Sequence, residues 1–541
     1  MDMAAASHPR ARTEPRRETK ARRVERRRRS IITFEMIRLD RAAAEPLHQQ
    51  LYRQIRDELT SGNFSDRSGR LPSSRSLAAR LAVSRETVDL AFSKLHAEGY
   101  LRSKIGSGTF VAKPLPETYL SAEKPKTSAQ IERPPRLAER LSRILDPRAG
   151  KQLDVGRGGV DVVSLRPGLP AVDEFPIEIW ERLRAQVLAR KGSNLLRYAS
   201  AHGDVDLRKA VAAYLSDSRG ARCHADQIII VAAMQHAMMV SALALLDPGD
   251  IAWMEDPGFK QARRVFSFVG AQVVPRPIDR EGIVVAHARG QTPPKMVFVT
   301  PSHQFPLGVT MSLERRKALI DFAHTQDAFI FEDDYNSEFR FNGPPLPCLQ
   351  GLDNIGRVIY AGTMSKILFP SLRLGYLCVP EPLVDSMIKV RAVMDQHCPA
   401  IDQATLARFL NEGFFLSHVK RMRQLYSERR DFFIEQFEKF FGEHFTLKIP
   451  EAGLHFVARL RRKKDFPLFL RARAETGIMP TKLSHYSIKA ESGPTFLFGF
   501  AAWSRAQIRE ALEKLALSFE RNKRQDNPPA PEREWLDSNY E

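Results

Sequence analysis

Cysteine is scarce in this chain, and the few cysteines present are not paired in sequence. The 541 residues include four cysteines, at positions 223, 348, 378 and 398, with no CxxC or other metal-ligand spacing. This pattern argues against a disulfide scaffold and against a bound metal, and it favours the reducing cytoplasm. The N-terminus carries no apolar segment of the kind found in secretory signals, and no internal repeat is present.

Long apolar runs are also rare, and one stretch has to be weighed as a membrane span. Ile228 to Leu246 is nearly all apolar, but Gln235 and His236 lie near its centre, and Asp226 and Asp247 flank it. A spanning helix needs about 20 predominantly apolar residues. The stretch therefore predicts a short buried strand that leads into a core helix, and no membrane partner is expected.

Positive charge, in contrast, is abundant. The formal net charge is +19 and the isoelectric point is about 9.8, which favours an anionic partner. Residues 8–30 alone hold eleven arginines and lysines. We predict a disordered basic arm over residues 1–43, which can add sequence-independent contacts to phosphates.

Three helical patterns and a hairpin follow the arm. Apolar residues recur every four positions between Leu47 and Leu59, which predicts an amphipathic helix. Ser73 or Ser74 can cap a second helix and Ser84 a third, because serine side chains accept hydrogen bonds from the free N–H groups of a first turn. Residues 100–111 carry two short apolar segments around a glycine-rich turn, which predicts a two-stranded wing.

The tight turn between the second and third helices is typical of a helix-turn-helix, whose second helix enters the DNA major groove. The N-terminal end of that helix faces outward, where an arginine can bind guanine. Periodicity alone also fits an ordinary small helical bundle with solvated charges. On the helix-turn-helix interpretation, the expected DNA contacts are Arg70, Arg75, Ser84, Arg85, Thr87, Arg102 and Lys104.

The sequence of residues 70–111, RLPSSRSLAARLAVSRETVDLAFSKLHAEGYLRSKIGSGTFV, resembles the GntR-type winged helix-turn-helix. The segments LPSSR, EGYL and GSGTFV of that pattern are intact. The resemblance implies an α+β winged helix-turn-helix over residues 44–113, with double-stranded operator or promoter DNA as its partner.

The rest of the chain divides into a connector, a large domain and a tail. Residues 114–158 are rich in Pro, Lys, Arg, Glu and Ser, and predict a linker. Over residues 159–521 apolar strands alternate with helical segments, which predicts an α/β domain with a mostly parallel sheet. Residues 522–541 are polar again and predict a disordered tail. The expected strands include residues 227–231, 295–300, 329–332 and 357–360.

Several segments of the α/β domain meet the chemical demands of pyridoxal phosphate, which needs an amine, a carboxylate, a phosphate site and an aromatic face. GTMSKILFPSLRLGY, residues 362–376, offers a lysine among apolar residues, and FIFEDDYNSEFRF, residues 329–341, ends a strand in acids. VAAMQHAMM, residues 231–239, is a strand-to-helix junction, and EDPGFKQAR, residues 255–263, contains an aromatic residue. Taken singly, each also fits a solvated charge or a core side chain.

Together these strings resemble fold-type-I aminotransferases over about residues 160–515, and the order of the two modules resembles the MocR/GabR subfamily of GntR-type regulators. The resemblance implies that Lys366 forms the Schiff base with pyridoxal phosphate. It also implies that Asp333 pairs with the pyridine nitrogen, although the adjacent Asp334 could take that role, and that Tyr335 bonds to the ring hydroxyl. The other implied cofactor-binding residues are Phe259, Thr363, Ser365, Arg373, Met234, Gln235 and, from the partner subunit of a homodimer, Tyr198.

Two positions depart from the family pattern, and one loop residue has no assigned role. Ala233 stands where relatives usually have glycine, which bears on how closely the phosphate can approach the backbone. PTFLFGFAAW, residues 494–503, lacks the arginine that commonly clamps the substrate carboxylate in an R-x-x-F-A strand. TPSHQFPLGVTMS, residues 300–312, is the implied substrate-side loop, and the role of His303 in it is open.

We therefore expect a bacterial cytoplasmic regulator, nucleoid-associated when bound to DNA. Its aminotransferase-like domain is expected to sense a small amine, an amino acid or the cofactor itself, with weak or no transaminase turnover. One alternative is an active aminotransferase that carries a DNA-binding appendage. Another is a DNA-binding protein whose second domain serves only for dimerisation.

Overall fold

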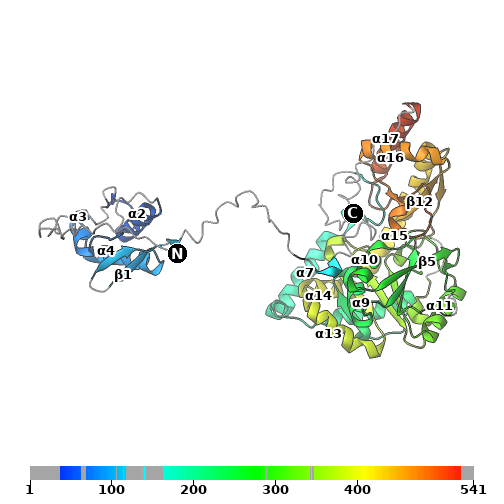
Figure 1. The fold of residues 1–541 in the computed structure, drawn as a ribbon, viewed down its shortest axis with the longest axis horizontal. Coiled ribbons are helices and arrows are strands. Elements are labelled where there is room, and N and C mark those ends of the chain that lie inside the picture. The colour runs from blue at the N-terminus through cyan, green and yellow to red at the C-terminus, as the bar shows by residue number, and fades with distance from the viewer. Residues whose placement is uncertain are drawn as a thin grey trace, which may run out of the picture. The chain divides into compact units, whose positions relative to one another are not determined.

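The computed structural model describes residues 34, 37–61, 69–104, 107–113, 115–116, 136, 138–141, 163–286, 290, 292–341, 343 and 346–525. Most of the predicted basic arm, most of the linker and the end of the predicted tail lie outside these residues, as does Gly106 of the predicted wing turn. The chain divides into two compact units, residues 1–135 and 136–541, and each is described by itself (Figure 1).

The N-terminal unit consists of three helices and a hairpin, as the sequence predicts. Ser73 Oγ accepts a hydrogen bond from the backbone N–H of Ser76, and Ser84 Oγ accepts one from Thr87, so the predicted caps are confirmed. Ala82 makes the tight turn with a left-handed φ of 54°. The elements are α2 (Leu47–Ser61), α3 (Ser74–Leu81), α4 (Arg85–Ala97), β1 (Leu101–Lys104) and β2 (Gly108–Val111).

A mostly parallel sheet of eight strands lies at the centre of the C-terminal unit, and this confirms the predicted α/β class. The order is β3-β10-β9-β8-β7-β4-β5-β6, and β10 and β6 run antiparallel to their neighbours. β8 and β9 continue past their predicted ends, so Asp333 and Thr363 lie within strands. The bounds are β3 (Ile228–Val231), β4 (Ile251–Asp256), β5 (Gln272–Asp279), β6 (Gly282–Ile283), β7 (Met296–Val299), β8 (Phe329–Asp334), β9 (Val358–Thr363) and β10 (Gly375–Cys378).

Helices cover both faces of this sheet, because alternate strand residues point to opposite faces. Ile229 and Ile359 pack in one apolar cluster with residues of α9, α10 and α13. Ile230 and Tyr360 pack on the other face with residues of α8 and α14. The helices are α7 (Ile177–Lys191), α8 (Val205–Arg219), α9 (Ala233–Leu245), α10 (Lys260–Val269), α11 (Leu313–Thr325), α12 (Leu349–Leu352), α13 (Val384–Asp395) and α14 (Ala400–Asn411).

A C-terminal lobe, orange to red in Figure 1, contains an antiparallel sheet of order β11-β12-β14-β13. α17 continues to Gln525, beyond the predicted end of the domain at residue 521. The stretch 228–246 forms β3 and α9, as predicted, and within the described ranges no helix has both the length and the apolar character to cross a bilayer. The elements of the lobe are α15 (Phe414–Phe441), β11 (Phe445–Lys448), β12 (His455–Leu460), α16 (Phe466–Thr476), β13 (Thr481–Lys482), β14 (Thr495–Gly499) and α17 (Arg505–Gln525).

Candidate functional site

The candidate DNA surface lies on α4, its cap and the wing. Arg85 is exposed at the first residue of α4, and its Nε lies 3.5 Å from Asp89 Oδ2 one turn later. The hydroxyls of Ser84 and Thr87 are 2.8 Å apart, and that of Ser84 also accepts the Thr87 N–H. These two hydroxyls lie at the N-terminal end of α4 and bond to each other. The arginines and lysine expected at phosphates, Arg70, Arg75, Arg102 and Lys104, are all exposed.

The lysine and the acids of the predicted cofactor site come from strands that end at the same edge of the large sheet. Lys366 follows β9, and its ammonium donates a hydrogen bond of 2.9 Å to the carbonyl of Gly168. Burial lowers the pKa of Lys366, while the negative charge of Asp333 opposes that shift. A lysine must lose its proton before it can attack an aldehyde, so a lowered pKa favours that chemistry.

Asp333 and Asp334 have different surroundings, which distinguishes the two candidates for the pyridine nitrogen. Asp334 Oδ2 accepts hydrogen bonds from Arg219 at 3.1 Å and from the Tyr360 hydroxyl at 2.6 Å. Asp333 is 4% exposed, and among the described residues its Oδ1 has no hydrogen-bond partner. Burial raises the pKa of Asp333 well above its ordinary value. Asp333 is therefore the acid that still lacks a partner in the site.

A cradle for an anion lies at the N-terminal end of α9. No side chain caps this helix, and its first residue, Ala233, has a left-handed φ of 65°. The exposed Arg373 reaches the same place, with its Nη2 3.4 Å from the carbonyl of Ala232. Thr363 and Ser365 are buried at the end of β9, and β10 joins β9 to β3, the strand that leads into α9. The Ser365 hydroxyl has no partner among the described residues. Uncapped N–H groups, hydroxyls and an arginine are the groups that bind phosphate.

The α9 residues that were expected to line this cradle differ in exposure. Met234 is buried and Gln235 is exposed, both in the first turn of the helix. Ala233 adopts a left-handed conformation, which a glycine would adopt freely and an alanine adopts only with strain. Tyr198 is 88% exposed and contacts the ring of His397, with centroids 6.1 Å apart. Within this chain it takes no part in the cradle, and its role stays a prediction about a partner subunit.

Aromatic side chains surround Phe305 on the substrate side of the site. The ring of Phe305 is 5.8 Å from that of Phe259 and 5.9 Å from that of Tyr335, centroid to centroid. Phe259, half-buried at the start of α10, and Tyr335, just after β8, are therefore both brought to the site edge of the sheet. Burial raises the pKa of the Tyr335 phenol well above its ordinary value, so this group is protonated at neutral pH.

Glu255 is a site residue to which the sequence interpretation gave no role. It is 1% exposed at the end of β4, and its Oε2 accepts hydrogen bonds from the Thr300 hydroxyl at 2.7 Å and from Gln304 at 3.3 Å. Burial raises its pKa to about 7. The signal was available, because Glu255 ends an apolar strand just as Asp333 does. It anchors the predicted substrate-side loop to the sheet.

β14 has an apolar residue where the clamping arginine would stand. Aligning R-x-x-F-A with residues 497–501 gives Leu497 the arginine position. Leu497 is fully buried and packs with Leu483, Tyr486 and the loop residues Phe305 and Leu307. The expected departure from the family pattern is therefore a packed apolar cluster.

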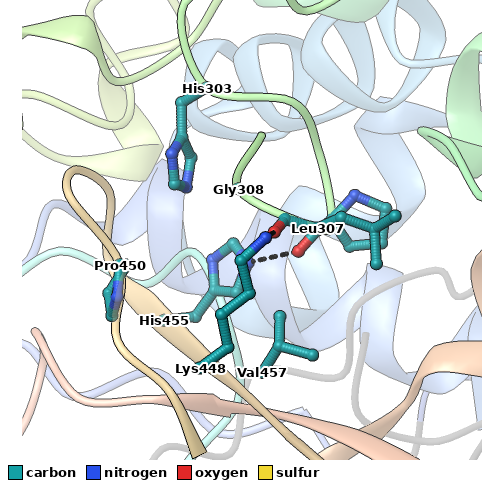
Figure 2. Close-up of a pocket in the computed structure, with 8 residues that line it drawn as sticks. His303, Leu307, Gly308, Lys448, Pro450, His455 and Val457 are labelled. Carbon is teal, nitrogen blue, oxygen red and sulfur yellow. Dashed lines mark hydrogen bonds between the residues drawn. The ribbon is translucent and has the colours of Figure 1, made fainter. Parts of the chain in front are cut away.

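A cavity lies between the substrate-side loop and β11 and β12 (Figure 2). Lys448 donates a hydrogen bond of 2.8 Å to the Leu307 carbonyl, and His455 bonds to the Pro306 carbonyl at 3.0 Å. His303 points into this space and is 2% exposed. Burial lowers its pKa to about 3, so the imidazole is neutral at physiological pH. His303 therefore lines the cavity as a neutral group.

Comparison with known proteins places both units in families. Residues 47–111 match the bacterial regulatory proteins of the gntR family, and residues 161–515 match the class I and II aminotransferases. The chain is 37% identical over 484 residues to the probable rhizopine catabolism regulatory protein MocR of Rhizobium meliloti. The match covers 90% of this chain and 96% of that protein. It is 33% identical to the transcriptional regulator TauR of Rhodobacter capsulatus, over 87% of this chain and 96% of TauR.

A solved kynurenine aminotransferase of Pyrococcus horikoshii, in complex with PMP, is similar in fold. It superposes with a TM-score of 0.61 at 27% identity, covering 71% of this chain and 95% of that one. Aminotransferases of this class depend on pyridoxal phosphate. The chain belongs to the MocR-type transcription regulators, which join a GntR-type DNA-binding domain to a domain of the class I and II aminotransferase family.

Proposed function

We propose that the C-terminal domain of this regulator binds pyridoxal phosphate at Lys366 and uses the bound cofactor to sense a small amine or amino acid. The observation that carries the proposal is a buried lysine of lowered pKa that interacts electrostatically with Asp333, a buried acid whose Oδ1 has no hydrogen-bond partner among the described residues. When bound, the cofactor supplies an aldehyde that reacts with amines and a ring that withdraws electrons.

The residues of the site have distinct tasks in this proposal. Asp333 holds a proton at the ring nitrogen, and this contact would relieve the cost of its burial. Tyr335 donates its phenolic proton to the ring hydroxyl, and Phe259 covers the ring face. The phosphate is held by the first-turn N–H groups of α9, including those of Met234 and Gln235, and by the side chains of Thr363, Ser365 and Arg373.

The N-terminal unit binds double-stranded DNA in this proposal, with α4 in the major groove and the wing along the backbone. Arg85 reads bases, and the arginines and lysine outside α4 contact phosphates. A homodimer is proposed for two reasons. Tyr198 is 88% exposed and resembles a residue that serves a neighbouring subunit, and helix-turn-helix proteins commonly read paired half-sites as dimers.

The apolar cluster at Leu497 supports sensing over turnover. Transamination needs the substrate held rigidly while a proton is moved, and removal of a positioning group lowers the rate steeply. A sensor needs only a ligand that binds two conformations unequally. An active enzyme would instead release a keto acid from one of the 20 common amino acids in a coupled assay.

The decisive experiment measures the visible absorption band of the purified protein with added pyridoxal phosphate. We expect a band in the wild type, its loss in Lys366→Ala, and its retention in the matched control Lys389→Ala. A footprint on the gene's own upstream region then tests regulation, with and without cofactor and a panel of amines. A colourless wild type would refute cofactor binding, and unchanged protection in every condition would refute sensing.

A further inference from the structure

β14 has no arginine, so another group would have to hold an acidic ligand next to Lys366. The apolar cluster around Leu497 closes the usual position. Arg373 lies at the phosphate cradle, beside the carbonyl of Ala232, and Lys448 bonds to the Leu307 carbonyl across the substrate-side loop.

The segment of residues 164–168 runs directly past this position. The Leu165 carbonyl accepts a hydrogen bond of 2.7 Å from the Gly499 N–H, so the segment lies along the end of β14. A Cβ on residue 499 would lie 1.7 Å from the Arg166 carbonyl oxygen, so this approach requires glycine. Two residues further on, the Gly168 carbonyl accepts the hydrogen bond from Lys366. Arg166 is therefore fixed between the end of β14 and the lysine.

The Arg166 backbone lies on the face of β14 that carries Leu497, because residues 497 and 499 point to the same face and a Cβ on residue 499 would meet the Arg166 carbonyl. The Nε and Nη1 of its side chain are buried. Burial raises the pKa of the Tyr486 phenol, and the positive charge of Arg166 opposes that shift, so the two side chains interact electrostatically. Tyr486 itself packs on Leu497 and stands 4.9 Å from the Phe305 ring, centroid to centroid. The arginine thus reaches the edge of the apolar cluster.

We propose that Arg166 binds the carboxylate of the effector, so that the sensor takes amino acids in preference to simple amines. The inference rests on the proposed function, because it needs an effector amine at Lys366. Arginine suits this task, since its planar fork matches a carboxylate in two parallel hydrogen bonds. The apolar surroundings strengthen the contact because they exclude water. In this proposal the positive charge for the carboxylate lies on the segment of residues 164–168 instead of on β14.

The test titrates the cofactor-loaded protein with matched pairs of ligands and follows the change in its visible absorption. L-alanine and β-alanine are each compared with ethylamine, and 4-aminobutanoate with propylamine. In the wild type we expect at least one acid to bind about 10- to 100-fold more tightly than its amine, as one charge-assisted contact allows. Arg166→Gln should remove that preference and leave the affinity for the amine within about twofold, and Arg166→Lys should retain part of it.

Arg461→Gln is the matched control, because Arg461 is an exposed arginine of the same domain. Melting temperature and the unliganded absorption spectrum of each variant confirm that fold and cofactor are intact. Equal loss of acid and amine in Arg166→Gln, or no loss of the acid, overturns the role of Arg166 while the proposed function stands. A cofactor band that responds to no ligand refutes amine sensing itself.

Discussion

Replacing Arg219 by alanine should destabilise the aminotransferase-like domain strongly, because it leaves two buried acids without their cation. Arg219 Nε lies 3.1 Å from Asp334 Oδ2, and Arg219 Nη2 lies 2.7 Å from Glu338 Oε1. All three side chains are less than 10% exposed. Removing one partner of a buried ion pair costs about 3–5 kcal/mol, because the remaining charge stays desolvated.

That loss translates into a measurable change of melting temperature. Unfolding entropy is about 2.1 cal/mol/K per residue, so the roughly 360 residues between 163 and 525 give about 0.76 kcal/mol/K. The expected fall is therefore about 4–7 °C, measured by scanning calorimetry at fixed protein and cofactor concentrations. Neutralising both acids, as Asp334→Asn with Glu338→Gln, should recover part of the loss in the Arg219→Ala background.

The matched control is Arg222→Ala. Arg222 is exposed on the connection that follows α8, three residues after Arg219, and its Nη1 bonds to Asn354 at 2.6 Å. Exposed substitutions of this kind change stability by about 0.5 kcal/mol or less, which is under about 1 °C here. A fall in Arg219→Ala no larger than that in Arg222→Ala would refute the argument that the two acids depend on a buried cation.

Other predictions concern pH, DNA and backbone strain. Burial raises the pKa of Glu255 in the folded protein to about 7. The protonated carboxyl therefore contributes its full stability below the pKa of the unfolded chain, and about 3 kcal/mol of this is lost as the pH rises through the folded pKa. The melting-temperature difference between wild type and Glu255→Gln should therefore change between about pH 4.5 and 7, and a constant difference contradicts this. Arg85→Ala should weaken operator binding about 10- to 100-fold in gel shifts, whereas Ser84→Ala should chiefly cost about 1 kcal/mol of helix stability. Ala233→Val should lower the melting temperature by about 1–4 °C because of its φ of 65°, and Ala233→Gly should not.

Local patterns were enough to predict the N-terminal unit. Its helices follow from an apolar residue every four positions and from serine caps, and both signals depend only on residues close in sequence. The structure confirms α2, the Ser73 and Ser84 caps and the two-stranded wing. The strands of the large sheet were likewise found from apolar runs. Their ends were placed too early at β8 and β9, because acids and a threonine continue the pairing inside a buried sheet.

The choice between Asp333 and Asp334 could not be made from sequence, because it depends on contacts across the fold. Adjacent strand residues point to opposite faces, so one acid must face away from the site. Which one does so is decided by Arg219 on α8, 115 residues earlier in the chain, and by the hydroxyl of Tyr360 on β9. Glu255 and the Gly168 contact of Lys366 were missed for the same reason, since their partners lie far away in the sequence.

The proposed cofactor groups and the apolar cluster around Leu497 lie on different elements of the fold: β8, β9 and α9 on the one hand, and β14 on the other. The groups proposed for the cofactor are Asp333, Thr363, Ser365 and the uncapped end of α9. On the substrate side, the apolar cluster around Leu497 occupies the position of the strand arginine. Since cofactor binding and substrate positioning use different contacts, one can persist while the other changes. A ligand can signal only through a difference in its contacts between two conformations.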